Sequence, residues 1–236
     1  MTDPLQESVL VIGVGGLGCP ASLALAVSGV RNIALVDPDR VALSNLPRQL
    51  WYRSSDIGKL KVESAALRLR RTFPQVRVEP IALRVDQGNV DSLLRAHSIA
   101  IDATDGVETK FLLSDAAVRC GVPLVYGGVL GMRGQAMLIA PGGPCLRCLF
   151  ESPPAGDDAP SCSEAGVLGS VAGIVGALQA AMAVQALDHF AGAGKLVSFD
   201  GRSLRQRTVE LRRAADCPVC GRARQAEPVW TEGARS

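Results

Sequence analysis

The feature that most constrains the fold is a glycine-rich turn between an apolar strand and a helix near the amino terminus. The apolar run Ser8–Ile12 predicts a buried strand, Gly13-Val14-Gly15-Gly16-Leu17-Gly18 fits the pattern G-x-G-x-x-G, and residues 18–28 predict a helix. A second apolar strand, Asn32–Val36, ends at Asp37. In such a βαβ unit the glycines let backbone amides approach a phosphate, and the acid can accept hydrogen bonds from a ribose. The unit therefore predicts nucleotide binding, although glycines used only for tight helix packing are the alternative.

Strands and helices continue to alternate along the chain. Periodicity predicts helices over 59–73 and 106–120 and strands over 76–85, 98–101, 123–126 and 135–140. This alternation predicts an α/β fold with a Rossmann-like, doubly wound, mostly parallel sheet. A carboxy-terminal extension, about 141–221, would add a polar loop over 151–164, an apolar helix over 165–187, and strands over Lys195–Asp200 and 207–211. We expect one domain over 1–221 and a flexible tail over 222–236.

Composition and charge exclude several classes of partner. A formal charge of +2 in 236 residues gives no basic stripe for nucleic acid, and residues 1–7 do not read as an export signal. The charge-free segment 165–187 is long enough to cross a bilayer, but it is rich in Ala and Gly and contains Gln179 and Gln185. A buried helix is the favoured interpretation. We expect a cytoplasmic protein that binds neither nucleic acid nor membrane.

Two pairs of cysteines carry the second strong signal. Cys145-Leu-Arg-Cys148 and Cys217-Pro-Val-Cys220 offer four thiolates, which is the ligand set of a closed, tetrahedral structural zinc site. The ion would staple the carboxy-terminal extension to the main sheet. A redox role is the alternative, but neither pair opens a helix within a thioredoxin-like pattern. Seven cysteines in total, an odd number, favour a reducing compartment over disulfides.

The other cysteines are single. Cys19 begins the helix after the glycine turn, and Cys120 ends a predicted helix, so packing is the favoured role of both. Cys162 lies in the polar loop, where an exposed thiolate could attack an acyl-adenylate or carry sulfur. Loop position alone leaves both a functional and a silent Cys162 open.

Charged residues gather where parallel strands are predicted to end. Asp37 and Asp105 each follow a predicted strand, and ligands of open α/β sheets bind at that edge. Arg48 and Lys61 could place two cations on a triphosphate, with Asp105 on Mg²⁺. Each of these residues alone could be an ordinary solvated charge. Together they predict a phosphate-transfer site.

These motifs, in this order, resemble the E1-like family that includes ThiF, MoeB and HesA proteins. The resemblance runs from Ser8 to Gly221 and rests on the glycine turn, Asp37, Ser44-Asn-Leu-x-Arg-Gln49, Lys61-Val-Glu-Ser, Asp102-x-Thr-Asp105 and the cysteine pairs. It implies an ATP-binding adenylation domain and a homodimer. It assigns the catalytic roles to Arg48, Lys61, Asp105 and Cys162. It assigns ATP and Mg²⁺ binding to Gly13, Gly15, Gly16, Gly18, Asp37, Asp39, Asn45, Arg48, Gln49, Lys61 and Asp105.

The implied reaction is ATP-dependent adenylylation of the C-terminal Gly-Gly carboxylate of a ubiquitin-like sulfur-carrier protein, for thiamine or molybdopterin biosynthesis. A terminal carboxylate has a pKa of about 3.5, so at neutral pH it is an ionised nucleophile that needs no general base. Catalysis then consists of aligning it with the α-phosphorus and neutralising the charge of the leaving pyrophosphate.

The chain departs from the family pattern at three places. Residues 1–7 lack the arginine that an amino-terminal extension supplies in relatives, Gly106 follows Asp105 where Asn is usual, and Lys110 replaces an arginine. A catalytically silent, nucleotide-binding partner subunit therefore stays open as the alternative function. An NAD-dependent oxidoreductase would share the glycine turn but would not need Arg48, Lys61 and Asp105.

Overall fold

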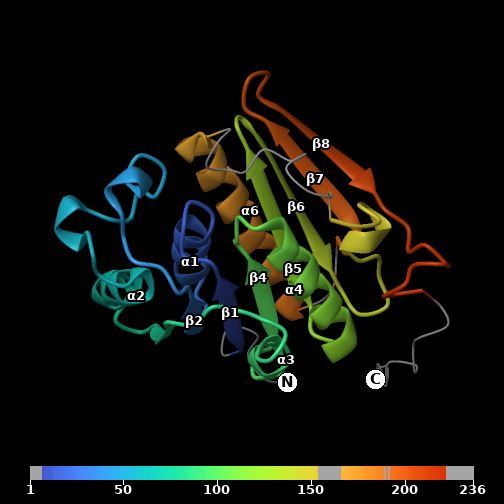
Figure 1. Ribbon diagram of the computed structural model, residues 1–236, viewed down its shortest axis with the longest axis horizontal. Coiled ribbons are helices and arrows are strands. Elements are labelled where there is room, and N and C mark those ends of the chain that lie inside the picture. Colours follow the sequence, from blue (N-terminus) through green and yellow to red (C-terminus); the bar gives the residue numbers. More distant parts are fainter. Residues whose placement is uncertain (1–6, 154–165, 189, 191, 222–236) are drawn as a thin grey trace, which may run out of the picture.

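The structure is a computed structural model that describes residues 7–153, 166–188, 190 and 192–221. Its eight-stranded sheet has the order β3-β2-β1-β4-β5-β6-β7-β8 (Figure 1). The strands are β1 (Ser8–Ile12), β2 (Asn32–Val36), β3 (Arg77–Ile81), β4 (Ile99–Asp102), β5 (Leu124–Leu130), β6 (Arg133–Ile139), β7 (Lys195–Asp200) and β8 (Arg205–Glu210). The helices are α1 (Gly18–Val27), α2 (Lys61–Thr72), α3 (Val90–Arg95), α4 (Val107–Cys120) and α6 (Gly169–Asp188), with short 3-10 turns η2 (Leu43–Asn45), η3 (Ser54–Asp56) and η4 (Leu146–Cys148).

The sheet joins a parallel part to an antiparallel one. Strands β3, β2, β1, β4 and β5 run parallel to one another, as the apolar runs and helical crossovers predict. From β5 onward the strands pair antiparallel, because β5–β6 and β7–β8 are hairpins with short connections. The doubly wound, mostly parallel α/β fold is confirmed, and the extension lengthens the same sheet.

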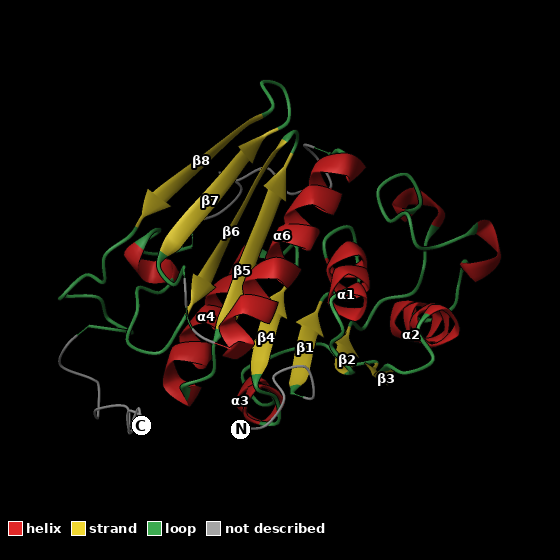
Figure 2. Cartoon of the chain, turned by 180° about the vertical axis from the view of Figure 1, so that it is seen from behind, coloured by secondary structure: helices red, strands yellow, loops and turns green. Residues whose placement is uncertain are grey.

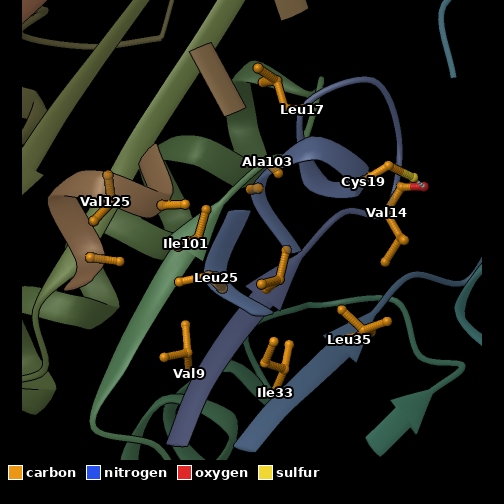
Figure 3. Close-up of a cluster of buried hydrophobic side chains, with 14 of the residues drawn as sticks. Val9, Val14, Leu17, Cys19, Leu25, Ile33, Leu35, Ile101, Ala103 and Val125 are labelled. Carbon is orange, nitrogen blue, oxygen red and sulfur yellow. Dashed lines mark hydrogen bonds between the residues drawn. The ribbon is translucent and has the colours of Figure 1, made fainter. Parts of the chain in front are cut away.

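Helices cover both faces of the sheet. Alternate residues of β1 point to opposite cores: Val9 and Val11 pack with α1, α2 and α6, whereas Leu10 and Ile12 pack with α3 and α4. Figure 3 shows the first of these cores, where Leu25 of α1 lies over the strand residues. The view from behind shows α6 lying along the sheet beside α1 (Figure 2). Because the helices lie on the two faces of the sheet, they leave the carboxyl ends of the parallel strands uncovered.

Helix α6 is the described helix that is long and apolar enough to cross a membrane. In the fold it packs on β4, β5, β6 and α1. A Cβ at Gly176 would lie 2.4 Å from the carbonyl oxygen of Leu17, so α6 touches the backbone of α1. The buried Gln179 amide donates to the carbonyls of Asp102 and Val125 at 2.7 and 3.1 Å. These contacts are those of a core helix, as the sequence favoured.

Several predicted boundaries differ from the observed ones. The strand predicted over 76–85 ends at Ile81, and its Pro80 is tolerated because β3 is an edge strand. The helix predicted over 59–73 begins at Lys61, because Leu60 forms an isolated bridge with Arg40. Helix α3 was not predicted, and the Asp86 carboxylate accepts the Gly88 and Asn89 amides just before it. The segments involved are too short for hydrophobic periodicity to predict their structure.

Candidate active site and cysteine cluster

The glycine turn after β1 is close-packed at its two ends. Gly13 has φ +88°, and a Cβ there would lie 2.6 Å from the carbonyl oxygen of Ala103. A Cβ at Gly18 would lie 1.8 Å from the carbonyl oxygen of Gly13. No larger residue fits either place without backbone movement. Gly13, Gly15 and Gly16 line an open cleft of about 1400 Å³, whereas Gly18 does not line it and instead closes the turn.

Asp37 holds the turn from the end of β2. Its carboxylate accepts the Val14 amide at 2.7 Å and the Asp39 amide at 2.8 Å. Burial raises the pKa of this carboxyl, which is 6% exposed, while the nearby Lys61 and the two amides act in the opposite direction. Each carboxylate oxygen keeps acceptor capacity after these bonds, so Asp37 can also accept from ribose hydroxyls in the cleft that it lines.

Lys61 is held in place at the start of α2. Its Nζ lies 2.8 Å from Asp39 Oδ2, and its backbone amide donates to the Asp39 carbonyl at 2.9 Å. The Lys61 side chain is 7% exposed, but the Asp39 side chain is 54% exposed. Both residues line the cleft. The ammonium group is therefore held in a fixed orientation at the cleft.

The Tyr52 hydroxyl links the glycine turn to α2, a role that sequence reasoning missed. It lies 2.7 Å from the Val14 carbonyl and 3.3 Å from the Lys61 carbonyl. Burial raises the Tyr52 pKa, so the hydroxyl stays protonated and donates. Tyr52 directly follows Leu50 and Trp51 in the sequence, so no local pattern singled it out.

We predict that Tyr52→Phe lowers the free energy of unfolding by about 1 kcal/mol, because a buried carbonyl loses its donor. Urea denaturation measures the change. Leu50→Ala is the matched control, because Leu50 lies in the same loop and is 74% exposed. Equal unfolding midpoints for the two variants would show that the hydroxyl does not hold the turn.

The loop after β2 brings Arg48 and Gln49 to the cleft. Arg48 Nη1 donates to the Ser44 carbonyl at 3.1 Å, and Gly169 of α6 packs against its backbone. Gln49 is 5% exposed, and its Oε1 is buried without a hydrogen-bond partner among the described residues. An unpaired, buried acceptor on a residue that lines the cleft fits a site that a ligand completes. Asn45 does not line the cleft; its carbonyl accepts the Arg48 and Gln49 amides at 3.1 and 3.0 Å.

Asp105 follows β4 and is exposed at the cleft. The loop that carries it is fixed by Asp102, which is fully buried and whose Oδ1 accepts the amide and the hydroxyl of Thr104 at 3.0 and 2.7 Å. Lys110 Nζ lies 3.3 Å from both Asp102 oxygens and donates to the Gly127 carbonyl at 2.5 Å. Lys110 therefore compensates the buried charge of Asp102 and ties β4 to β5. From the sequence, Lys110 was recognised only as a lysine in place of the usual arginine of the family, and its contacts with Asp102 and Gly127 were not predicted.

The cleft brings together most of the predicted nucleotide-site residues. Its lining includes Gly13, Gly15, Gly16, Asp37, Asp39, Arg48, Gln49, Lys61 and Asp105. It extends beyond them over β5 to β8, where it is lined by residues that were not predicted, among them Phe111, Gly128, Gln135, Phe150, Ser198 and Arg207. Cys162 lies outside the described residues. One end of the cleft thus offers backbone amides and cations, and the other an open sheet face.

The four cysteines of the two pairs form one cluster. All four Sγ atoms lie within 4.8 Å of one another, with Cys145 and Cys217 at 3.6 Å and Cys148 and Cys220 at 3.3 Å. Tetrahedral zinc with Zn–S bonds of about 2.3 Å places its sulfurs about 3.8 Å apart, so the cluster fits zinc. Because η4 follows β6 and the second pair follows β8, the cluster joins the two ends of the extension.

The thiols of this cluster differ in acidity. Burial raises the pKa of Cys145 to about 12. Burial also acts to raise the pKa of Cys217, but backbone amides of Cys220 and Val219 donate to its sulfur and lower the pKa to about 7. Backbone N–H groups directed at sulfur are the surroundings that a metal-bound thiolate uses.

The sequence of the chain matches the ThiF family over residues 3–219. The chain belongs to the ThiF family. The SAMP-activating enzyme E1 of Haloferax volcanii is 42% identical over 219 residues, which are 92% of this chain and 81% of that enzyme. The sulfur carrier protein adenylyltransferase of Thermus thermophilus is 40% identical over 224 residues, covering 92% of this chain and 83% of that protein. The expected E1-like membership is confirmed.

Longer relatives and solved structures extend this result. The adenylyltransferase and sulfurtransferase MOCS3 of Aedes aegypti is 40% identical over 219 residues, and the match covers 91% of this chain but 50% of MOCS3. The crystal structure of Escherichia coli MccB with ATP superposes with a TM-score of 0.80 at 22% identity, over 92% of this chain and 68% of MccB. At that identity the likeness concerns the fold, and it agrees with the α/β architecture of this ThiF family member.

Proposed function

We propose that this protein is an adenylyltransferase that uses ATP to activate the C-terminal Gly-Gly carboxylate of a ubiquitin-like sulfur-carrier protein. The observation that carries the proposal is that the glycine turn, Arg48, Lys61 and Asp105 all line the same cleft. The names of the relatives from H. volcanii and T. thermophilus support this activity. Carrier-dependent exchange of labelled pyrophosphate into ATP tests it.

The nucleotide would span the cleft from β2 to β4. Asp37 would accept the ribose hydroxyls, the amides of the glycine turn would face the phosphates, and Arg48 and Lys61 would add two positive charges. Asp105 would hold a magnesium ion, which neutralises charge on the phosphates when bound. A carboxylate on an exposed loop that is fixed from below by Asp102 and Thr104 fits that role.

In the proposed reaction the carrier carboxylate attacks the α-phosphorus. A bond forms between the carboxylate oxygen and phosphorus, the bond to the bridging oxygen breaks, and pyrophosphate leaves with the electron pair. The nucleophile is already ionised, so the protein has no proton to remove. Arg48 and Lys61 stabilise the charge that develops on the leaving group, and the cleft aligns the reactants. The product is a carrier acyl-adenylate, and Cys162 remains a candidate for later sulfur chemistry.

The carrier tail would enter from the side of the extension. The cleft continues past Asp105 over Gly128 of β5 and Gln135 of β6, toward Ser198 and Arg207. Gly128 leaves room for the Tyr126 side chain, because a Cβ at Gly128 would lie 2.8 Å from the Tyr126 hydroxyl. A slender chain end such as Gly-Gly fits a passage of this kind. Sulfur transfer toward thiamine and toward molybdopterin both agree with this arrangement.

We also propose that the chain forms a homodimer through the outer side of α6. From Gly169 to Leu187 the helix carries no charge, and its outer side exposes Ile174 (46% exposed) with Ala177 and Ala181. Gly173 has nothing within 4 Å of its Cβ position inside the chain, whereas Gly169, one turn before it, packs against the backbone of Arg48. An uncharged, partly apolar helix side of this kind is typical of an interface.

For the dimer, we predict that the wild-type protein sediments as a dimer at micromolar concentration and that Ile174→Asp weakens dimerisation at least about tenfold, because a charge would be buried at the interface. Leu67→Asp on α2 is the control, since Leu67 is exposed to a similar extent, 50%. A strictly monomeric wild-type protein, or equal weakening by the control, would contradict this interface.

A further inference from the structure

Arg147 lies inside the first cysteine pair but directs its side chain toward α4. Its Nε lies 2.9 and 3.0 Å from the two carboxylate oxygens of Asp115, and its Nη2 lies 2.8 Å from Oδ2. This is a two-pronged guanidinium–carboxylate pair, the geometry that holds two elements in a fixed relation. Next to it, the Leu146 amide donates to the Ser114 hydroxyl at 3.1 Å. The cysteine turn is therefore fastened to α4 at two adjacent places.

The same guanidinium contacts the wall of the cleft. Its central carbon lies 5.2 Å from the centroid of the Phe111 ring, and its Nη1 donates to the Glu151 carbonyl at 3.3 Å. Phe111 and Glu151 both line the cleft, together with Leu146 and Phe150. One side chain thus joins the cysteine turn, helix α4 and the backbone that follows η4. The pair with Asp115 is partly buried, with 23% and 21% of the two side chains exposed.

This wall lies at the end of the cleft away from the ribose site. Asp37 ends β2, the glycine turn follows β1, and Asp105 follows β4, so the nucleotide would occupy neighbouring strand ends. Helix α4, which carries Phe111, packs on β5 and β6. Adjacent strands are about 4.8 Å apart, so the wall stands beyond the nucleotide, where the second substrate must approach.

We propose that Arg147 is a positioning residue that transmits the geometry of the cysteine cluster to the tail-binding wall formed by Phe111, Phe150 and Glu151. The nature of the second substrate, a carrier tail, rests on the function proposed above. The contacts of Arg147 with Asp115, Phe111 and Glu151 do not depend on it. The metal site then shapes substrate binding as well as stabilising the extension.

Steady-state exchange kinetics of Arg147→Ala and Asp115→Ala test the effect on substrate binding. We expect the KM for the carrier to rise about tenfold or more, the scale for losing one charge-assisted hydrogen-bond pair, while the KM for ATP stays within about twofold. Zinc content should remain equal to that of the wild type. Arg147→Lys should restore only part of the loss, because an ammonium cannot form both prongs. Equal increases in both KM values together with zinc loss would show that Arg147 supports only the cluster, and would overturn the proposal.

Arg119→Ala is the matched control. Arg119 also lies on α4 and also forms a two-pronged pair, with Asp91 at 2.5 and 3.1 Å, but neither partner lines the cleft.

Hydrogen exchange of the free full-length protein gives a second measurement that needs no activity. Amides of residues 148–152 should exchange at least about tenfold faster in Arg147→Ala than in Arg119→Ala, because only the former releases that backbone. Identical exchange rates in the two variants would refute the positioning role. If the wild type lacked carrier-dependent activity, the proposed function would fail, whereas hydrogen exchange would still decide the role of Arg147.

Discussion

Asp105→Asn and Arg48→Ala should each lower carrier-dependent pyrophosphate exchange at least about hundredfold, the usual scale for losing one electrostatic contributor to a transition state. Asp105 lies on the exposed loop after β4, and an amide in its place would bind a magnesium ion more weakly. Arg48 lines the cleft together with the glycine turn, where we propose that the phosphates bind, so alanine would leave the developing charge with fewer partners. Initial rates at saturating ATP and carrier measure the effect on kcat.

Both variants should fold normally, since neither side chain belongs to the buried cores. Glu108→Gln serves as a control, because it removes an exposed carboxylate from the first turn of α4, near Asp105 but outside the cleft lining. A control that loses as much activity as Asp105→Asn would point to general charge effects. Full activity of Arg48→Ala would remove Arg48 from the mechanism.

Purified protein should hold about one zinc ion per chain, and Cys217→Ser should release it and lower the free energy of unfolding by more than about 3 kcal/mol. A closed four-sulfur site ties η4 to the chain after β8, so its loss frees the end of the extension. Each thiol must lose its proton to bind the ion as a thiolate, so zinc affinity should fall as pH is lowered. Metal analysis and thermal unfolding provide the two measurements.

Cys120→Ser is the matched control for the zinc experiment. Cys120 is a half-buried thiol at the end of α4, where its Sγ lies 4.0 Å from the Asp91 carbonyl, outside the cluster. Its replacement should leave the zinc content unchanged. Wild-type protein that carries no zinc after expression with ample metal would contradict the assignment, whatever the behaviour of the variants.

Local patterns in the sequence were sufficient for the frame of the site. The apolar runs of β1 and β2 and the glycines between them predict the turn, because Gly18 is required by a contact with Gly13 only five residues away. The requirement at Gly13 comes instead from Ala103, which the sequence pattern did not reveal. The cysteine pairs predict the cluster even though Cys145 and Cys217 are 72 residues apart, because four thiolates share one ion. In both cases the residue type, glycine in a tight turn or cysteine as a metal ligand, limits the structures that the segment can form.

The interactions that the sequence did not reveal join residues of ordinary type over long distances. Tyr52 reaches Val14 across 38 residues, and Lys110 reaches Gly127 across 17. No local pattern distinguishes such a tyrosine or lysine from its neighbours, so the pairing emerges only when the sheet brings the elements together. Arg147 is similar: its place within a metal-binding motif concealed its contacts with α4.

The most direct test of the proposed activity is exchange of labelled pyrophosphate into ATP by the wild-type protein, with several Gly-Gly-ended carriers including one encoded beside its gene. Exchange should require both magnesium and a carrier, and it should disappear when the two terminal glycines of the carrier are removed. ATP binding without exchange for any carrier would contradict the proposed activity. The chain would then be a nucleotide-binding partner subunit rather than the enzyme.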